Sequence, residues 1–345
     1  MTLHRAVMWL LVSFWFLTAC HDPPKLVPVD DEVPLMCIAG SFTLTRANPS
    51  VMLVLDRSGS MASTFGAGSR WSALTQGLAA TLPAVDDSME LGALFFPQTG
   101  KDAQCSLPST TALDPSTGQV DALVAQMRAT SPSGGTPTAD AIDLAASVLS
   151  TLASPRTAHA LLLATDGAPD CNASLPYGQC TCLQGTSCQP AQCLDDARTV
   201  SRVAAQAAAG LPTYVIGIHD SGDQLFSSVL ERLASAGGRA RHGSTHGYYA
   251  ADSQSDLQAA LSAIRDEVGS CIYLTNSVPT DAGAITVTVD GAAVPYDASG
   301  ASGWQWGRKT NGEIVLQGET CAAVMARAGA AVVKASITCS SEVLQ

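Results

Sequence analysis

The chain has 345 residues, of which 46% are hydrophobic and 14% are charged. This composition excludes an intrinsically disordered protein and provides enough apolar material for one large core and a smaller unit. The formal net charge is −12. Because the sequence contains no cluster of lysine or arginine residues, it argues against nucleic acid as a partner. The acidity by itself favours solubility.

The first 19 residues have the pattern of a signal peptide. A short basic start precedes an apolar run that extends to Leu17, as is typical of exported proteins. The tetrad LTAC at residues 17–20 resembles the bacterial lipobox, which implies cleavage before Cys20 and lipidation of that cysteine. An ordinary secretory peptide or an uncleaved anchor is the alternative. No other segment is long and apolar enough to span a bilayer.

Residues 20–40 are rich in proline and acidic residues and are predicted to form an extended tether. His21 follows the cysteine at the position where inner-membrane lipoproteins of well-studied bacteria carry aspartate. The resemblance therefore implies an exported, lipid-anchored protein at the outer membrane or cell surface of a Gram-negative bacterium. The membrane is then reached through the lipid alone.

Cysteine usage agrees with export. The sequence has eleven cysteines, and ten remain when Cys20 is set aside, an even number that fits disulfides in an oxidising compartment. Five of the ten lie within residues 171–193, so complete pairing needs a bridge from this group to a cysteine outside it, for which Cys105 is the candidate. Zinc is the alternative for the group, but it contains no C-x-x-C pair. The disulfide candidates are Cys37, Cys105, Cys171, Cys180, Cys182, Cys188, Cys193, Cys271, Cys321 and Cys339.

The stretch VMLVLDRSGSM at residues 51–61 organises the rest of the chain. Its first five residues are all apolar. They are too few to span a membrane, and they lack the polar alternation of a strand with one solvent-exposed face, so they predict a central parallel strand. Asp56, Ser58 and Ser60 follow at the carboxyl end of this strand, where open α/β sheets bind ligands. Carboxylate and hydroxyl oxygens are suitable donors for a divalent cation. The alternative is an Asx-turn with serine caps at the start of the next helix.

Two further segments place polar residues at the same edge. The segment SPSGGTPT at residues 131–138 holds Thr136 after two glycines and at the mouth of a predicted helix. A second apolar strand at residues 160–164 leads to Asp166 in a Thr-Asp-Gly turn. A capping threonine and an ordinary turn would explain each segment alone, but not their recurrence at one edge of a parallel sheet.

Together these residues resemble the metal-ion-dependent adhesion site of von Willebrand factor type A (vWA) domains. The pattern of that family is D-x-S-x-S in a first loop, a threonine in a second loop and an aspartate in a TDG turn. The sequence has Asp56, Ser58 and Ser60, then Thr136 and then Asp166, in the same order. Each motif alone is weak, and the combination in a strand-then-helix context is strong.

The resemblance extends from residue 50 to residue 269 and implies an α/β fold with a doubly wound, mostly parallel sheet. It also implies a magnesium ion, with manganese or calcium as substitutes, because magnesium prefers an octahedral shell of oxygen atoms. The three hydroxyls would bind the ion directly and the two aspartates directly or through water. In this family an acidic side chain of the partner completes the shell. The implied partner is a protein or peptide with an exposed Asp or Glu carboxylate.

Alternation of strands and helices independently predicts the doubly wound sheet. We assign residues 41–270 to the vWA domain, with a cysteine-rich insertion at residues 171–193, and expect an edge strand near residues 42–45. Apolar runs predict strands at residues 51–55, 90–96, 160–164, 213–218 and 248–250. Helical spacing predicts helices at residues 71–82, 120–127, 142–149, 197–209, 225–233 and 257–268.

The alternation of apolar and polar residues predicts that residues 271–345 form a β-rich extension. Because the ends of such domains often lie together, we expect a Cys37–Cys271 bridge, with Cys321 and Cys339 closing a local loop. Trp304 and Trp306 share a strand face and either stack on a sugar or, more simply, pack in a core. Alternating residues and an Asp-Gly turn predict strands at residues 285–289, 292–296, 304–306, 313–316 and 332–338.

Three classes of function follow from these features. The favoured one is a lipid-anchored adhesion or binding module that uses a divalent cation and is not an enzyme. The second is a structural, disulfide-stabilised surface protein in which the ion only stiffens loops. The third is a metal-dependent hydrolase, which is disfavoured because the loops offer no histidine and no spare acid to serve as a base.

Overall fold

The computed structural model describes residues 35–98, 100, 105–152, 157–172, 175, 179–182, 193–218, 224–327 and 330–339. The predicted signal peptide, Cys20, most of the tether and Cys188 lie outside these residues, as does most of the insertion. The described residues all belong to one compact unit of the chain.

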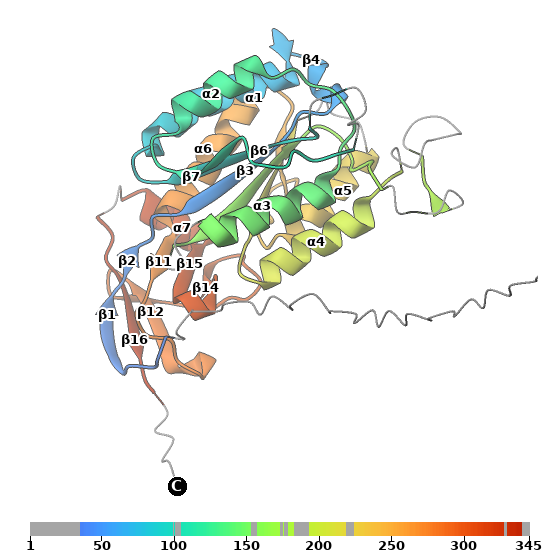
Figure 1. Ribbon diagram of the computed structural model, residues 1–345. Coiled ribbons are helices and arrows are strands. Elements are labelled where there is room, and N and C mark those ends of the chain that lie inside the picture. The colour runs from blue at the N-terminus through green and yellow to red at the C-terminus, as the bar shows by residue number, and fades with distance from the viewer. Residues whose placement is uncertain are drawn as a thin grey trace, which may run out of the picture. The chain divides into compact units, whose positions relative to one another are not determined.

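A six-stranded sheet forms the centre of the α/β part (Figure 1). Its strands run in the order β10-β9-β8-β3-β6-β7, and all neighbours are parallel except β6 and β7. After β3, the chain forms β6 and β7 on one side of it and then β8, β9 and β10 on the other side. The direction of strand addition therefore reverses between β3 and β8. The bounds are β3 (Ser50–Asp56), β6 (Glu90–Phe96), β7 (Leu113–Ser116), β8 (His159–Thr165), β9 (Thr213–Ile218) and β10 (Tyr249–Ala251).

Helices cover both faces of this sheet because the buried strands have apolar side chains on both sides. Leu53 of β3 packs in a core that includes residues of three helices on one face, and Val54 packs in the core on the other face. The first face carries α1 (Arg70–Thr81), α2 (Val120–Ala129) and α6 (Gln254–Ser270), and the second carries α3 (Thr138–Leu152), α4 (Asp196–Ala208) and α5 (Gln224–Ala236) (Figure 1). The prediction of a doubly wound, mostly parallel sheet is confirmed.

Two antiparallel sheets adjoin the amino end of β3. One has the strand order β1-β16-β12-β13 and the other β14-β15-β11-β2. The edge strand expected near residues 42–45 is thus divided into two strands, both of which pair with C-terminal strands. A third core lies between the sheets. The bounds are β1 (Gly40–Thr43), β2 (Thr45–Arg46), β11 (Ile272–Leu274), β12 (Ile285–Val289), β13 (Ala292–Val294), β14 (Gly303–Trp306), β15 (Glu313–Gln317) and β16 (Val333–Ile337).

Short elements complete the described chain. Helix α7 (Gly318–Met325) was not expected from the sequence, because its eight residues directly follow a strand. A small hairpin of β4 (Thr64–Phe65) and β5 (Gly68–Ser69) precedes α1. The single-turn 3-10 helices are η1 (Gly59–Ala62), η2 (Leu82–Val85), η5 (Ala282–Ala284) and η6 (Lys309–Asn311).

The disulfides correct two predicted pairings. Cys37 pairs with Cys339, and Cys271 pairs with Cys321, so both the Cys37–Cys271 bridge and the Cys321–Cys339 loop were wrong. The reason is that β1 pairs antiparallel with β16, with Gly40 opposite Ile337, which brings the residues flanking these strands together. The sequence could not show this pairing of the first strand with the last.

The bridge expected between the cysteine group and the rest of the chain is present, because Cys105 pairs with Cys171. Cys180 pairs with Cys193 within the group, and Cys182 is also disulfide-bonded. Trp304 is 2% exposed and packs edge-on against Trp306 with ring centroids 5.4 Å apart, so Trp304 serves the core. None of the helices in the described residues combines the length and the apolar character needed to cross a membrane.

Candidate metal centre

The candidate site lies where the strand order of the main sheet reverses. Asp56 ends β3, and Asp166 directly follows the neighbouring strand β8. Leu55 of β3 lies opposite Ala164 of β8 in parallel register, so the two carboxylates emerge at the same edge. This is the position at which open α/β sheets bind ligands.

Asp56 is held by its own loop and by the neighbouring strand. One carboxylate oxygen accepts a hydrogen bond from the Ser58 backbone N–H (2.7 Å), and the other accepts one from the Thr165 hydroxyl (2.6 Å). The residue has no exposed surface. The carboxylate is therefore fixed in orientation before any ligand binds.

The two serines of the first loop connect the site to Asp166. The hydroxyl oxygens of Ser58 and Ser60 lie 3.0 Å apart, and the Ser60 hydroxyl donates to Asp166 Oδ1 at 2.7 Å. Adjacent ligands of an octahedral magnesium ion, with bonds of 2.0–2.1 Å, lie about 2.9 Å from each other. These hydrogen-bond distances are compatible with adjacent positions in a magnesium shell.

The second loop lies against the first. The Gly59 N–H donates to the Gly134 carbonyl (2.9 Å) and the Ser133 N–H donates to the Arg57 carbonyl (2.8 Å). Thr136 is buried beside these contacts. The structure thus joins four of the five predicted ligands by direct contacts and brings Thr136 next to them through its loop.

Burial raises the pKa of both carboxylates. Burial, followed by the nearby charge of Asp166, raises the pKa of Asp56 to about 7, and burial also raises the pKa of Asp166. Two buried acids of this kind need positive charge nearby. A divalent cation fits this need and fits the donor set of hydroxyls and carboxylates. In the described part of the chain, no three His, Cys, Asp or Glu side chains group as metal ligands.

Arg70 was not predicted, although it contacts the site directly. Its guanidinium Nη1 lies 2.8 Å from Asp166 Oδ2, and the Arg70 side chain is 15% exposed. A capping box formed by Ser69 and Ser72 begins α1 immediately before Arg70, and the Arg70 N–H donates to the Ser63 carbonyl. The residue belongs to none of the three motifs, so only the folded hairpin and helix start reveal its place.

Asp170 is a second residue that the sequence did not reveal, and it corrects the expectation that the loops hold no spare acid. Its Oδ1 accepts the Thr136 backbone N–H at 2.6 Å, and burial raises its pKa. The carboxylate thus links the loop of Asp166 to the loop of Thr136. Through this hydrogen bond Asp170 positions the Thr136 loop.

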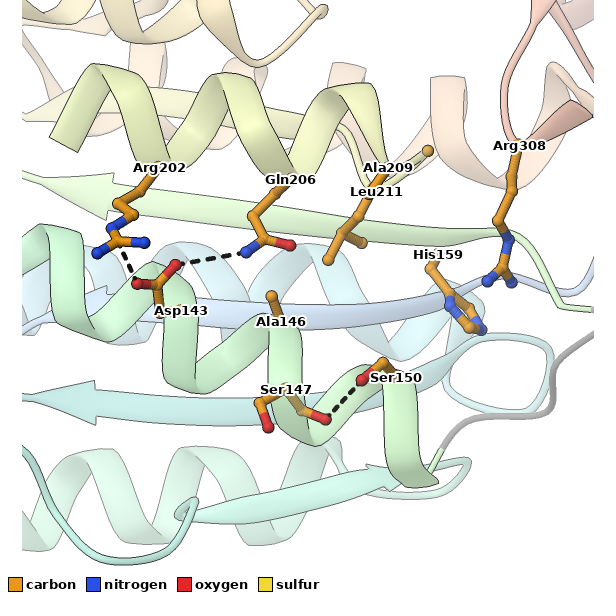
Figure 2. Close-up of a pocket in the computed structure, with 11 residues that line it drawn as sticks. Asp143, Ala146, Ser147, Ser150, His159, Arg202, Gln206, Ala209, Leu211 and Arg308 are labelled. Atoms are coloured by element: carbon orange, nitrogen blue, oxygen red, sulfur yellow. Dashed lines mark hydrogen bonds and ion pairs between the residues drawn. The ribbon is translucent and has the colours of Figure 1, made fainter. Parts of the chain in front are cut away.

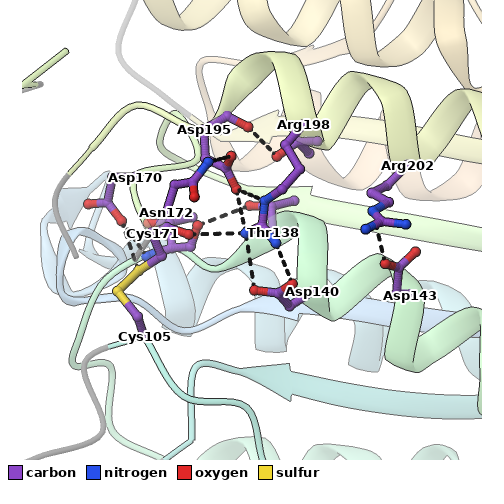
Figure 3. A network of polar contacts seen from close by, with 12 residues as sticks. Cys105, Thr138, Asp140, Asp143, Asp170, Cys171, Asn172, Asp195, Arg198 and Arg202 are labelled. Atoms are coloured by element: carbon purple, nitrogen blue, oxygen red, sulfur yellow. Dashed lines mark hydrogen bonds and ion pairs between the residues drawn. A yellow bond between two sulfur atoms is a disulfide. The ribbon is translucent and has the colours of Figure 1, made fainter. Parts of the chain in front are cut away.

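A network of charged groups supports this loop from outside (Figure 3). Arg198 of α4 donates to Asp195 (2.8 Å), to Asp140 of α3 (2.6 Å) and to the Cys171 carbonyl (3.2 Å). Asn172 donates to the other oxygen of Asp195 at 2.6 Å. Two helices and the Cys105–Cys171 bridge therefore hold the segment that follows Asp166.

We predict that Asp170→Ala weakens magnesium binding about fivefold, because loss of one hydrogen bond to a charged acceptor costs about 1 kcal/mol and loosens the Thr136 loop. Asp170→Asn keeps the acceptor oxygen and should bind magnesium like the wild type. Calorimetric titration of both variants measures the effect. Equal losses in the two variants would mean that charge, and not the hydrogen bond to Thr136, is what matters.

A separate hollow of about 360 Å³ lies along the contact of α3 and α4 toward the start of β8 (Figure 2). Asp143 lies on its wall, where it pairs with Arg202 at 3.2 Å and accepts from Gln206 at 3.4 Å. His159 and Arg308 line its other end. Asp143 and Arg202 thus form an acid–arginine pair outside the candidate site, which makes them suitable controls for Asp166 and Arg70.

No family model and no curated protein matches the sequence. Among solved structures, the pilus adhesin SpaC from Lactobacillus rhamnosus GG in its open conformation is 16% identical with a TM-score of 0.49, covering 86% of this chain and 40% of that one. The vWF domain of the type V pili tip protein Mfa5 from Porphyromonas gingivalis is 13% identical with a TM-score of 0.43, covering 64% and 94%. The manganese-loaded TRAP protein from Plasmodium vivax is 17% identical with a TM-score of 0.43, covering 65% and 76%. This chain therefore spans about 40% of the length of SpaC.

Proposed function

We propose that the chain is an adhesion or binding module of the vWA type that holds a divalent cation and binds an acidic partner through it. The observation that carries the proposal is a series of contacts: the Ser58 backbone N–H donates to Asp56 (2.7 Å), the Ser58 and Ser60 hydroxyl oxygens lie 3.0 Å apart, and the Ser60 hydroxyl donates to Asp166 (2.7 Å). Thr136 completes the proposed ligand set from the second loop. Magnesium is the proposed ion, and manganese or calcium has compatible oxygen preferences.

The donor set explains why a partner would bind. Three of the five proposed ligands are neutral hydroxyls, so the two carboxylates only balance the charge of the ion. When bound, the ion supplies Lewis acidity at a position that the protein leaves open. A carboxylate of a protein or peptide partner has the charge and the oxygen atoms to fill that position. The partner class is therefore one with an exposed Asp or Glu side chain.

The setting proposed for this module is extracytoplasmic. Disulfides such as Cys37–Cys339 and Cys105–Cys171 fit an oxidising compartment. Together with the signal-peptide pattern and the lipobox resemblance at Cys20, they favour a lipid-anchored protein at the outer membrane or cell surface.

We propose a binding role and not a catalytic one. In this proposal Asp170 positions the Thr136 loop, because its Oδ1 accepts the Thr136 N–H. Arg57 is buried and donates to the Gln98 carbonyl and to Ser133, and an arginine does not serve as a general base at neutral pH. The alternative favoured by the disulfides is a structural surface protein in which the ion only stiffens the three loops.

A peptide array tests the proposal and separates it from the structural alternative. The purified full chain is applied to peptides that carry a central Asp, Glu, Asn or Gln in otherwise identical sequences, with magnesium, with manganese and with EDTA. We expect binding to Asp or Glu peptides only, only with a metal ion, and none for Asp166→Asn. Metal binding without any peptide binding would favour the structural role. Equal binding to Asn and Asp peptides would exclude a metal–carboxylate contact.

A further inference from the structure

A cavity lies beside the candidate metal centre, at the same edge of the main sheet. Its volume is about 410 Å³, within the range of ligand-binding pockets. It is lined by residues that end or follow β6, by the segment of residues 108–112 before β7, and by Thr130, which directly follows α2. None of the five proposed metal ligands lines it, so the binding of the ion itself does not require it.

Arg57 connects this cavity to the metal centre. The residue stands between the proposed ligands Asp56 and Ser58, and it also lines the cavity. Its Nη2 donates to the Gln98 carbonyl (3.3 Å), which belongs to the cavity wall, and to the Ser133 hydroxyl (2.9 Å) in the second loop of the metal centre. The cavity wall is therefore held directly against the loops that carry the proposed ligands.

The cavity begins one strand away from the metal centre. Asp56 at the end of β3 lies opposite Phe96 at the end of β6, and Pro97, which follows Phe96, lines the cavity. The Arg57 N–H donates to the Phe96 carbonyl at 2.7 Å and keeps the two strand ends together. Neighbouring strands lie about 4.8 Å apart, and an extended chain advances about 3.3 Å per residue. A partner segment held at the metal ion therefore reaches the cavity with a side chain one to three residues from its carboxylate.

The accessible part of the wall is uncharged. Ser109 and Thr110 are exposed, and the half-buried Gln98 adds an amide. Among the described residues that line the cavity, Arg57 alone is charged; it is 1% exposed and takes no part in contact with a ligand. The exposed acid Asp114 does not line the cavity. The apolar residues of the wall are Phe95, Pro97, Pro108 and Ala112.

An aromatic side chain suits this wall better than a charged one. A charged group would lose hydration there and find no opposite charge within reach. A tyrosine or phenylalanine ring gains apolar contact with the two prolines, and a phenol O–H finds hydroxyl and amide partners. The wall is firm behind this contact, because Phe95 packs edge-on against Trp71 with ring centroids 5.5 Å apart.

We propose that this cavity receives an aromatic side chain of the partner, tyrosine or phenylalanine, one to three residues from the metal-bound carboxylate. The inference rests on the proposed function, because the carboxylate at the metal ion anchors the segment. The ring packs against Pro108 and the apolar wall, and a tyrosine hydroxyl exchanges a hydrogen bond with Gln98, Ser109 or Thr110. The partner class narrows from any exposed acid to an acid with an aromatic neighbour.

Fluorescence anisotropy with labelled peptides tests this inference on the purified full chain in magnesium. Each peptide has one central Asp in a Gly-Ser background, and Tyr, Phe, Ser or Lys is placed in turn at each of the three positions on either side. We expect Tyr and Phe at one of these positions to tighten binding about tenfold relative to Ser, and Lys to give less than this gain.

Thr110→Trp, at the exposed part of the wall, fills the cavity and should abolish the aromatic gain. The variant should keep the affinity of the wild type for magnesium and for the peptide with Ser, because Thr110 contacts no proposed metal ligand. Thr151→Trp is the matched control, since Thr151 is an exposed threonine of α3 that does not line the cavity, and it should keep the gain.

Four results would overturn the inference. Equal affinities for the Tyr, Phe and Ser peptides at every position would exclude the cavity from partner binding, whereas the proposed function would stand, because the Ser peptides still bind through the metal ion. An equal gain with Lys would mean that charge and not the cavity selects the partner. A gain that persists in Thr110→Trp would place the aromatic side chain elsewhere. No binding of any Asp peptide would remove the proposed function and this inference with it.

Discussion

Asp56→Asn should weaken magnesium binding at least a hundredfold, about 2.7 kcal/mol or more. The substitution keeps the size of the side chain and an oxygen that can accept the Ser58 N–H, but it removes one of the two charges that balance the ion. Because Asp56 is fully buried and its charged form is repelled by Asp166, loss of that charge does not itself destabilise the fold. We expect normal unfolding without metal ion and no rise in Tm when magnesium or manganese is added.

Asp143→Asn is the matched control for this experiment. It removes the same unit of charge from α3, where Asp143 pairs with Arg202 outside the candidate site. Calorimetric titration should give wild-type magnesium affinity for this variant. If Asp56→Asn binds magnesium as the wild type does, or if Asp143→Asn loses binding equally, the assignment of the metal centre to Asp56 fails.

The sequence predicted the central part of the candidate site because each of its motifs is a local pattern that follows a predicted strand or precedes a predicted helix, even though Ser60 and Asp166 are 106 residues apart. Apolar runs such as residues 51–55 and 160–164 mark buried parallel strands, and the polar residues after them must emerge at one edge of the sheet. The order of the motifs predicted that Ser58, Ser60 and Asp166 share this edge, and in the structure the two serine hydroxyl oxygens lie 3.0 Å apart and the Ser60 hydroxyl donates to Asp166.

Arg70 and Asp170 could not be predicted in this way. Their contacts, Arg70 with Asp166 and Asp170 with Thr136, span 96 and 34 residues of sequence. They depend on where α1 begins and on how the segment after Asp166 folds back, and neither position has a distinctive pattern. The sequence therefore identified candidate ligands but not the groups that set their charge and position.

The C-terminal region shows the same limit at the level of the fold. Its strands were predicted from alternation and from the Asp290-Gly291 turn, because those signals are local. The pairing of β1 with β16, and therefore the Cys37–Cys339 bridge, joins residues about 300 positions apart. An alternating pattern of apolar and polar residues identifies a strand but not the strand with which it pairs, since every exposed strand edge carries the same backbone N–H and C=O groups.

Arg70→Gln should increase magnesium affinity about tenfold, or about 1.4 kcal/mol. Arg70 already supplies positive charge to Asp166 at 2.8 Å, so an ion that binds Asp166 meets a cation at close range. Two like charges 4 Å apart repel by about 4 kcal/mol at an effective dielectric constant of 20. The partial exposure of Arg70 reduces this repulsion, and the ion's larger charge increases it. Glutamine retains a donor for Asp166 without the charge.

The same variant has a second expected effect on stability. Without a metal ion, the variant leaves buried Asp166 with neutral donors only, so Tm should fall. With magnesium, Tm should rise by more than in the wild type. Arg202→Gln is the matched control, since it breaks the Asp143–Arg202 pair in the hollow along α3 and α4, and its magnesium affinity should not change. Weaker binding by Arg70→Gln would mean that Arg70 orients Asp166 for the ion and does not compete with it, which would make the arginine a supporting part of the metal centre.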